Sequence, residues 1–134
     1  MYINCNLYRN PRQPMKLPRI LSLLVALMGF VHIAATFSPL IGGKLASLDA
    51  ATYWAMIYMS LMCGLLLVTL GAFLWYSLGK TAECSALKPL MRAAAVLLLI
   101  NGVAAVCFMP HNPFAWTIGV LCATEFVLLL KRVK

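Results

Sequence analysis

Three side chains that could carry chemistry lie within long apolar stretches of the sequence. They are His32, Asn101 and Glu125, and Ser60 lies within a further apolar stretch. A carboxyl group surrounded by hydrocarbon is costly when ionised, so it usually faces other protein groups and marks a functional site. We therefore take His32, Asn101, Glu125 and Ser60 as a candidate intramembrane polar site, with Glu125 as the group that could bind a proton. The alternative is that Glu125 and His32 are neutral groups whose hydrogen bonds hold helices together.

The rest of the sequence is too apolar for a soluble protein. Of its 134 residues, 63% are hydrophobic and 10% are charged, and the mean hydropathy is +0.92. Soluble domains carry about a quarter charged residues, and a chain this short cannot hide so much apolar surface in one core. The surplus must face lipid, which indicates an integral membrane protein.

Four apolar segments between charged residues are long enough to cross a membrane. Each has about the length that a helix needs to span ~30 Å of hydrocarbon, and none has the strict alternation of a membrane β-strand. We predict an all-α integral membrane four-helix bundle with antiparallel, up-down-up-down helices. The expected spans are about 18–40, 51–78, 89–110 and 113–130, in a transmembrane domain of residues 18–130 between a basic polar segment, 1–17, and a basic tail, 131–134.

Prolines indicate where these helices begin and end. Pro39 and Pro110 fall where the first and third helices should stop, and Gly42-Gly43 is expected to continue the first break. Pro113 suits the first turn of the last helix. The connections are short, which favours antiparallel neighbours.

The basic residues predict the orientation in the membrane. Ten of the eleven Lys and Arg lie before the first span, in the middle connection or in the tail, and only Lys44 lies on the other side. By the positive-inside rule, both termini are expected in the cytoplasm. Attraction of these clusters to anionic lipid accounts for the net charge of +8 without a nucleic-acid partner. Tyr53, Trp54 and Trp116, near segment ends, are expected to anchor the chain at the membrane interface.

Small residues recur at three- and four-residue steps along the expected helices. In lipid, small side chains let helix backbones approach closely, so these residues should line the interior of the bundle with the candidate polar site. The positions expected to pack helices together are Gly29, Gly64, Gly71, Ala94, Ala105 and Gly119.

The five cysteines form no Cys-x-x-Cys motif, and we expect them to be small core residues rather than redox or metal ligands. They are Cys5, Cys63, Cys84, Cys107 and Cys122. A haem between helices needs two axial ligands at matched depth, whereas His32 is the only histidine within an expected span. Zinc would need at least three converging ligands. No metal or cofactor is therefore expected.

Several features together resemble the small DoxX-like four-helix membrane proteins of bacteria. They are Gly29-Phe30-Val31-His32 in the first span, Gly64 and Gly71 in the second, and Asn112-Pro113 before the last. The resemblance covers the number and order of the spans over most of the chain. It implies an accessory subunit in the bacterial inner membrane, in some cases linked to quinone or thiol redox systems, and it transfers no catalytic residue.

The sequence favours a non-enzymatic role, because the loops are too short to form a soluble active site. The first interpretation is a subunit or adaptor of a larger membrane assembly, with the lipid bilayer and other membrane subunits, or further copies of the chain, as partners. The second is an oligomeric transporter of small solutes or protons that uses Glu125 with His32 and Asn101. The third is a redox- or quinone-associated membrane subunit in which His32 donates a hydrogen bond.

Overall fold

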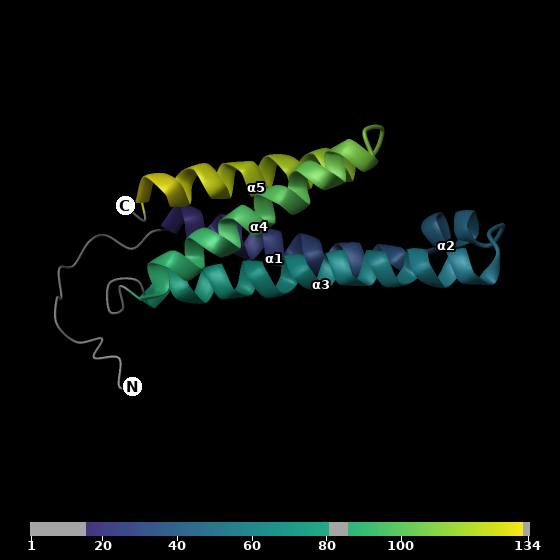
Figure 1. Cartoon of the computed structure of the whole chain (residues 1–134), viewed down its shortest axis with the longest axis horizontal. Helices are drawn as coiled ribbons and strands as arrows, with labels where there is room; N and C mark the ends of the chain where they lie inside the picture. Colours follow the sequence, from purple (N-terminus) through teal and green to yellow (C-terminus); the bar gives the residue numbers. More distant parts are fainter. Residues whose placement is uncertain (1–15, 81–85, 133–134) are drawn as a thin grey trace.

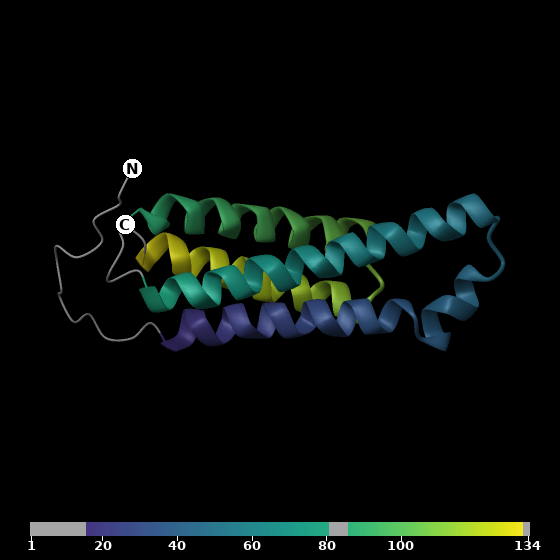
Figure 2. The ribbon, with the colours of Figure 1, turned by 90° about the horizontal axis from the view of Figure 1, so that it is seen from below.

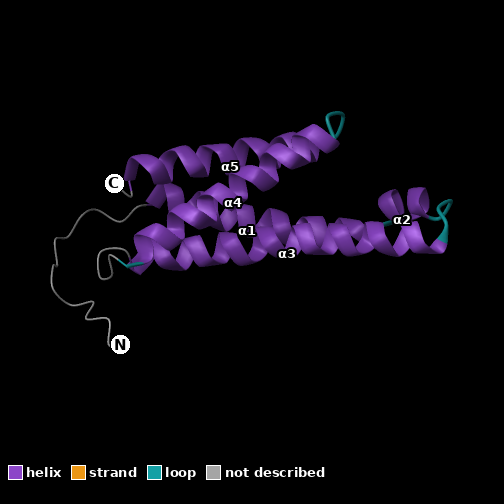
Figure 3. Ribbon diagram, viewed as in Figure 1, coloured by secondary structure: helices purple, strands orange, loops and turns teal. Residues whose placement is uncertain are grey.

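The computed structural model describes residues 16–80 and 86–132, and these ranges are helical, with no strand (Figures 1 and 3). Four of the helices are long and apolar enough to cross a membrane, which confirms the prediction of an all-α chain with four such segments. Cys5 and Cys84 lie outside the described residues. The helices are α1 (Lys16–Thr36), α2 (Pro39–Leu45), α3 (Ala50–Lys80), α4 (Leu87–Phe108) and α5 (Pro113–Arg132).

The expected first span, 18–40, is divided into α1 and the short helix α2. After Thr36 the chain tightens, because the amides of Phe37 and Ser38 bond to carbonyls only three residues earlier, at 3.2 and 3.0 Å. Pro39, which has no N–H, then begins α2. Gly42 and Gly43 lie within α2, so the prediction that they continue the break was wrong.

Side-chain caps begin α3 and α5. Oδ1 of Asp49 accepts hydrogen bonds from the amides of Ala51 and Thr52, both at 3.1 Å, and Oδ1 of Asn112 accepts one from the amide of Phe114 at 3.0 Å. These bonds satisfy amides that have no partner within the helix. Hydrogen bonds from Thr52, and a weaker one from Ala51, also hold the pKa of Asp49 below its usual value.

Helix α1 packs mainly on α3, at two points where glycine allows close approach. A Cβ atom on Gly29 would lie 2.7 Å from the carbonyl oxygen of Gly64, and one on Gly71 would lie 2.7 Å from the amide nitrogen of Ala26. Both distances are shorter than real Cβ contacts, so any larger residue would push the two backbones apart.

Helix α4 packs mainly on α5 in a similar way. A Cβ atom on Gly102 would lie 3.2 Å from Cα of Gly119, and one on Gly119 would lie 2.8 Å from a methyl group of Val106. Ala94 and Ala105 are buried in α4. Gly102 was not among the positions expected to pack helices together. It directly follows Asn101, which was expected to face the interior of the bundle.

The two helix pairs join through smaller contacts between α1 and α5 and between α3 and α4. Lys16, Lys80 and Arg132 lie at one end of the bundle, which we call the basic end (Figure 1). At the other end, the α2 end, helix α2 and the first turns of α3 extend past the tip of the α4–α5 pair (Figures 1 and 2). Large apolar side chains cover much of the outer surface, as expected for helices in lipid.

Candidate functional site

Glu125 makes the polar contact nearest the basic end. Its side chain on α5 is fully buried, and its Oε1 atom lies 2.5 Å from Oγ of Ser22 on α1. Oγ of Ser22 also lies 2.9 Å from the carbonyl oxygen of Pro18. Oε2 of Glu125 is buried and has no hydrogen-bond partner. This contact joins the first and last long helices of the chain.

His32 belongs to a second polar contact, nearer the α2 end. Its Nε2 atom lies 3.2 Å from Oγ of Ser60 on α3, and that Oγ lies 2.7 Å from Oγ1 of Thr36. The Thr36 hydroxyl also donates to the carbonyl of His32 at 2.9 Å. The imidazole ring stacks on Phe114 of α5, with 5.6 Å between ring centroids and 21° between ring planes. The contact therefore fixes the His32 ring between α3 and α5.

Asn101 takes part in a third contact, between α4 and α3. The thiol of Cys63 donates a weak hydrogen bond to Oδ1 of Asn101 at 3.4 Å, while Nδ2 of Asn101 is buried without a partner. Cys63 lies three residues after Ser60 on α3, so this contact is about one turn from the His32 contact. No hydrogen bond given for the described residues joins Asn101 to His32.

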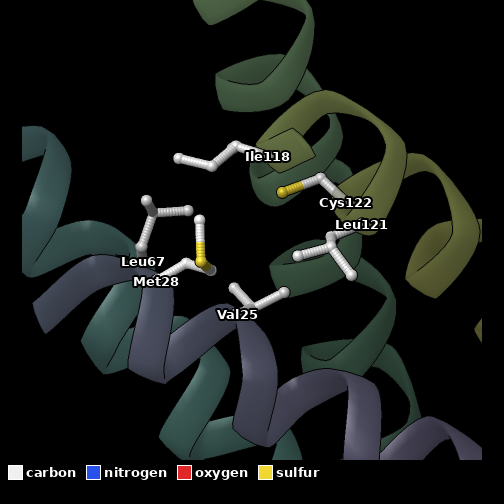
Figure 4. A pocket seen from close by; sticks show the side chains of 6 residues that line it. All are labelled: Val25, Met28, Leu67, Ile118, Leu121 and Cys122. Carbon is white, nitrogen blue, oxygen red and sulfur yellow. The ribbon is translucent and has the colours of Figure 1, made fainter. Parts of the chain in front are cut away.

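Along α1 and α5, mostly apolar side chains lie between Glu125 and the His32 contact, and we call them the apolar layer (Figure 4). Ser22 and His32 are ten residues apart on α1, which corresponds to ~15 Å along the helix. The space within the layer has no room for a water molecule. It is lined by Val25 and Met28 of α1, Leu67 of α3, and Ile118, Leu121 and Cys122 of α5.

The structure therefore brings His32 and Ser60 together, and it places Asn101 one turn away and Glu125 about three turns away. No hydrogen bond given for the described residues joins His32 to Glu125. Each of the three contacts joins a different set of helices. The Glu125 contact joins α1 with α5, the His32 contact joins α1 with α3 and α5, and the Asn101 contact joins α3 with α4.

Ser22, Thr36 and Cys63 are the partners that the sequence analysis did not assign to the site. Position along the helices could have indicated Ser22 as a partner of Glu125. Ser22 lies six residues after the start of α1, and Glu125 lies seven residues before the end of α5. Both are thus ~10 Å from the basic end. Depth alone does not say which faces of α1 and α5 meet.

Arg19 adds a cation at the basic end. Its Cζ atom lies 5.1 Å from the centre of the Trp75 ring on α3, a cation–π contact, while its Nε is buried without a hydrogen-bond partner. Oγ of Ser77, also on α3, is buried and has no partner. The basic end thus holds two further polar groups whose hydrogen bonds are incomplete within the described residues.

Within residues 16–80 and 86–132, no three His, Cys, Asp or Glu side chains lie close enough together to hold a metal ion. Cys63 is half-buried, Cys122 is buried and Cys107 is exposed, and none of the three is in a disulfide. The arrangement can hold helices together and can bind a proton at Glu125. Searches of protein-family models, curated proteins and solved structures found no match to this chain.

Proposed function

We propose that the protein is a non-enzymatic subunit of a larger membrane assembly and that it binds its partner through the α2 end. The observation that carries this proposal is a set of exposed, largely apolar side chains at that end, on α3 and beside the end of α1, which we call the outer shoulder. Its side chains are between 49% and 67% exposed. The outer shoulder consists of Phe37, Trp54, Met56, Tyr58 and Met59.

The position of the outer shoulder relative to lipid follows from the length of α3. The hydrogen bond between Thr36 and Ser60 places Ser60 level with the end of α1. From Ser60 to Lys80, α3 already covers ~30 Å, the thickness of the hydrocarbon core. The ten residues of α3 before Ser60 add ~15 Å, so the outer shoulder reaches the headgroup layer.

The chemistry of the outer shoulder favours a protein partner there. Trp54 and Tyr58 suit the headgroup layer by themselves, because each combines an apolar ring with a polar group. Phe37, Met56 and Met59 have no such group, and Met59 is 67% exposed. Methionine is common at surfaces that bind apolar partners because its side chain adapts in shape. An apolar surface on a second membrane subunit would cover these side chains.

The orientation is part of the same proposal. Consecutive spans cross the membrane in opposite directions, and the basic end lies in the cytoplasm, where anionic lipid attracts its Lys and Arg side chains. The outer shoulder then faces the opposite side of the membrane. The inner membrane of a bacterium is the location that fits this arrangement.

The interior of the bundle supports a structural role more than transport. The polar contacts of His32, Asn101 and Glu125 each join two or three helices, and the apolar layer lies between His32 and Glu125 along α1 and α5. A carrier of solutes would need a continuous polar path. The apolar side chains between His32 and Glu125 favour a bundle that presents a rigid surface to a partner.

Site-specific photocrosslinking tests the proposal. A photoreactive benzophenone amino acid at position 59 should crosslink, in intact membranes, to one discrete protein. The matched control is position 97, because Leu97 is 48% exposed and lies near the middle of α4, where only lipid is expected. It should give lipid adducts. Lipid adducts from both positions would contradict the proposal.

Purification in mild detergent gives an independent measurement. The full chain should carry the same crosslinked protein in a fixed ratio, and Met59→Lys should reduce that ratio at least tenfold because a charge would be buried against an apolar surface. Leu97→Lys would itself disturb insertion, so Ala46→Lys in the exposed α2–α3 connection is the control for added charge. A ratio unchanged by Met59→Lys would place the partner elsewhere.

A further inference from the structure

The protonation state of Glu125 decides how many hydrogens are available for the hydrogen bonds at Ser22. Oγ of Ser22 lies within hydrogen-bond distance of two oxygens, the Pro18 carbonyl at 2.9 Å and Oε1 of Glu125 at 2.5 Å. A serine hydroxyl has a single hydrogen to donate, and a carbonyl oxygen can only accept. If the hydroxyl serves Pro18, the hydrogen between Ser22 and Glu125 must belong to the carboxyl group.

The burial of Glu125 favours the same assignment. As a carboxylate, it would carry a negative charge with Oε2 buried and unbonded, which is costly in an apolar interior. As a carboxylic acid, it donates from Oε1 to Ser22 and leaves Oε2 as an uncharged carbonyl oxygen. We propose that Glu125 is a proton-binding site and that in the packed bundle it is a neutral acid that donates its hydrogen to Ser22.

No cation among the described residues pairs with Glu125 in a way that would stabilise its ionised form. Arg19 is one turn from Ser22 on α1, but its guanidinium group lies over Trp75 on α3. No ion pair to Glu125 is found among the described residues, and Glu125 is their only acid within a membrane-spanning helix. Among the side chains that the structure describes, the other ionisable ones in the half of the bundle nearest the basic end are Lys16 and Arg19 of α1, Tyr76 and Lys80 of α3, Lys88 and Arg92 of α4, and Cys122 and Lys131 of α5.

The site should exchange its proton with one side of the membrane only. Along α1 and α5, the apolar layer lies beyond Glu125 toward the α2 end, and its side chains leave no water-sized space among themselves. The basic end is ~10 Å away and holds the polar groups of Arg19 and Ser77. Loss of the proton would leave an unpaired charge in the contact between α1 and α5. Protonation of Glu125 from the basic end therefore controls the stability of the contact between these two helices.

Infrared spectroscopy of the full chain in liposomes tests this proposal directly. At neutral pH the wild-type protein should show the carbonyl stretch of a protonated carboxylic acid, and carbon-13 labelling of glutamate should shift that band. Glu125→Gln should remove it, and Ser22→Ala should move it to higher frequency because a hydrogen bond is lost. Asp49→Asn is the control, because it should remove carboxylate absorption only.

The wild-type spectrum decides the question even where a variant fails to fold. A labelled chain with no carboxylic acid band at neutral pH would overturn the proposal. Sidedness is measured by raising the pH on one side of oriented liposomes. The band should disappear when the basic end faces the alkaline side and persist when the α2 end does, and the reverse result would overturn one-sided access.

Discussion

Hydroxyl groups within the spans differ according to whether their helix face meets another helix. Thr69 and Thr124, on exposed faces, donate only to carbonyls of their own helix, for example Thr69 to Leu65 at 2.9 Å. Ser22 and Thr36 make the same local bond and also reach a second helix. The hydrogen bond to a carbonyl of the same helix costs that helix little. At Ser22 and Thr36, the hydrogen bond to a side chain of the other helix therefore fixes the neighbouring helix.

A double-mutant cycle on Thr36 and Ser60 should measure that second bond. Thr36→Val and Ser60→Ala should show a coupling free energy of about 0.6 kcal/mol, with about 1.7 kcal/mol as the upper limit for hydrogen bonds between membrane helices. Unfolding in mixed micelles gives the values. Thr69→Val combined with Ser60→Ala is the control and should be additive. Equal coupling in both cycles would show that the Thr36–Ser60 bond contributes nothing specific.

Asp49 leads to a prediction about pH at the start of α3. Its pKa is lowered in the folded chain, so its stabilising contribution is present above the ordinary pKa of an aspartate and is lost as the pH falls through the lowered value. Hydrogen-exchange protection of the Ala51 and Thr52 amides should fall over that acidic range. Asp49→Asn keeps the cap without the charge, so its protection should not change with pH. A pH response that persists in this variant would assign the effect to another group.

At the scale of elements, the sequence predicts helices better than it predicts how they meet. Pro39, Pro110 and Pro113 mark helix ends because proline restricts the backbone whatever surrounds it. Helix α2 was missed, since seven residues with two glycines have no periodic pattern to detect. The pairing of Ser22 with Glu125 was also missed. It depends on helix rotation and tilt, which packing between helices sets and hydropathy does not reveal.

Glycine substitutions should separate contact from propensity. Gly71→Ala should destabilise the bundle by about 1–3 kcal/mol, because its Cβ would overlap backbone atoms of Ala26 and Ser22. Gly43→Ala is the matched control in α2. A Cβ there meets nothing within 4 Å, so a neutral or slightly stabilising effect is expected. Thermal unfolding in detergent compares the two, and a neutral Gly71→Ala would contradict the close packing of α1 on α3.

At the scale of the whole molecule, the chain has two ends of different character. The basic end gathers Lys and Arg side chains, whereas the α2 end carries the outer shoulder on the part of α3 that passes the α4–α5 tip (Figure 1). In the arrangement that we propose, charge sets the orientation, and helix length sets which surface is left for a partner. Both follow from physical rules that act before any specific contact is made.

Reporter fusions test that orientation. A fluorescent protein fused after Lys134 should be bright, and alkaline phosphatase fused after Ser47 should be active, because the first folds in the cytoplasm and the second only across the membrane. The swapped fusions are the controls and should give little signal. Phosphatase activity after Lys134 would reverse the proposed topology and place the outer shoulder in the cytoplasm.

The pairing of α1 with α3 and of α4 with α5 has a consequence for biogenesis. Each closely packed pair is made of spans that are consecutive in synthesis, and the contacts between pairs are fewer. A nascent chain can therefore complete its first hairpin in the bilayer before the second leaves the ribosome. Glu125 lies on the second of these pairs and Ser22 on the first, so their bond can form only after the second pair has entered the bilayer and joins the two pairs.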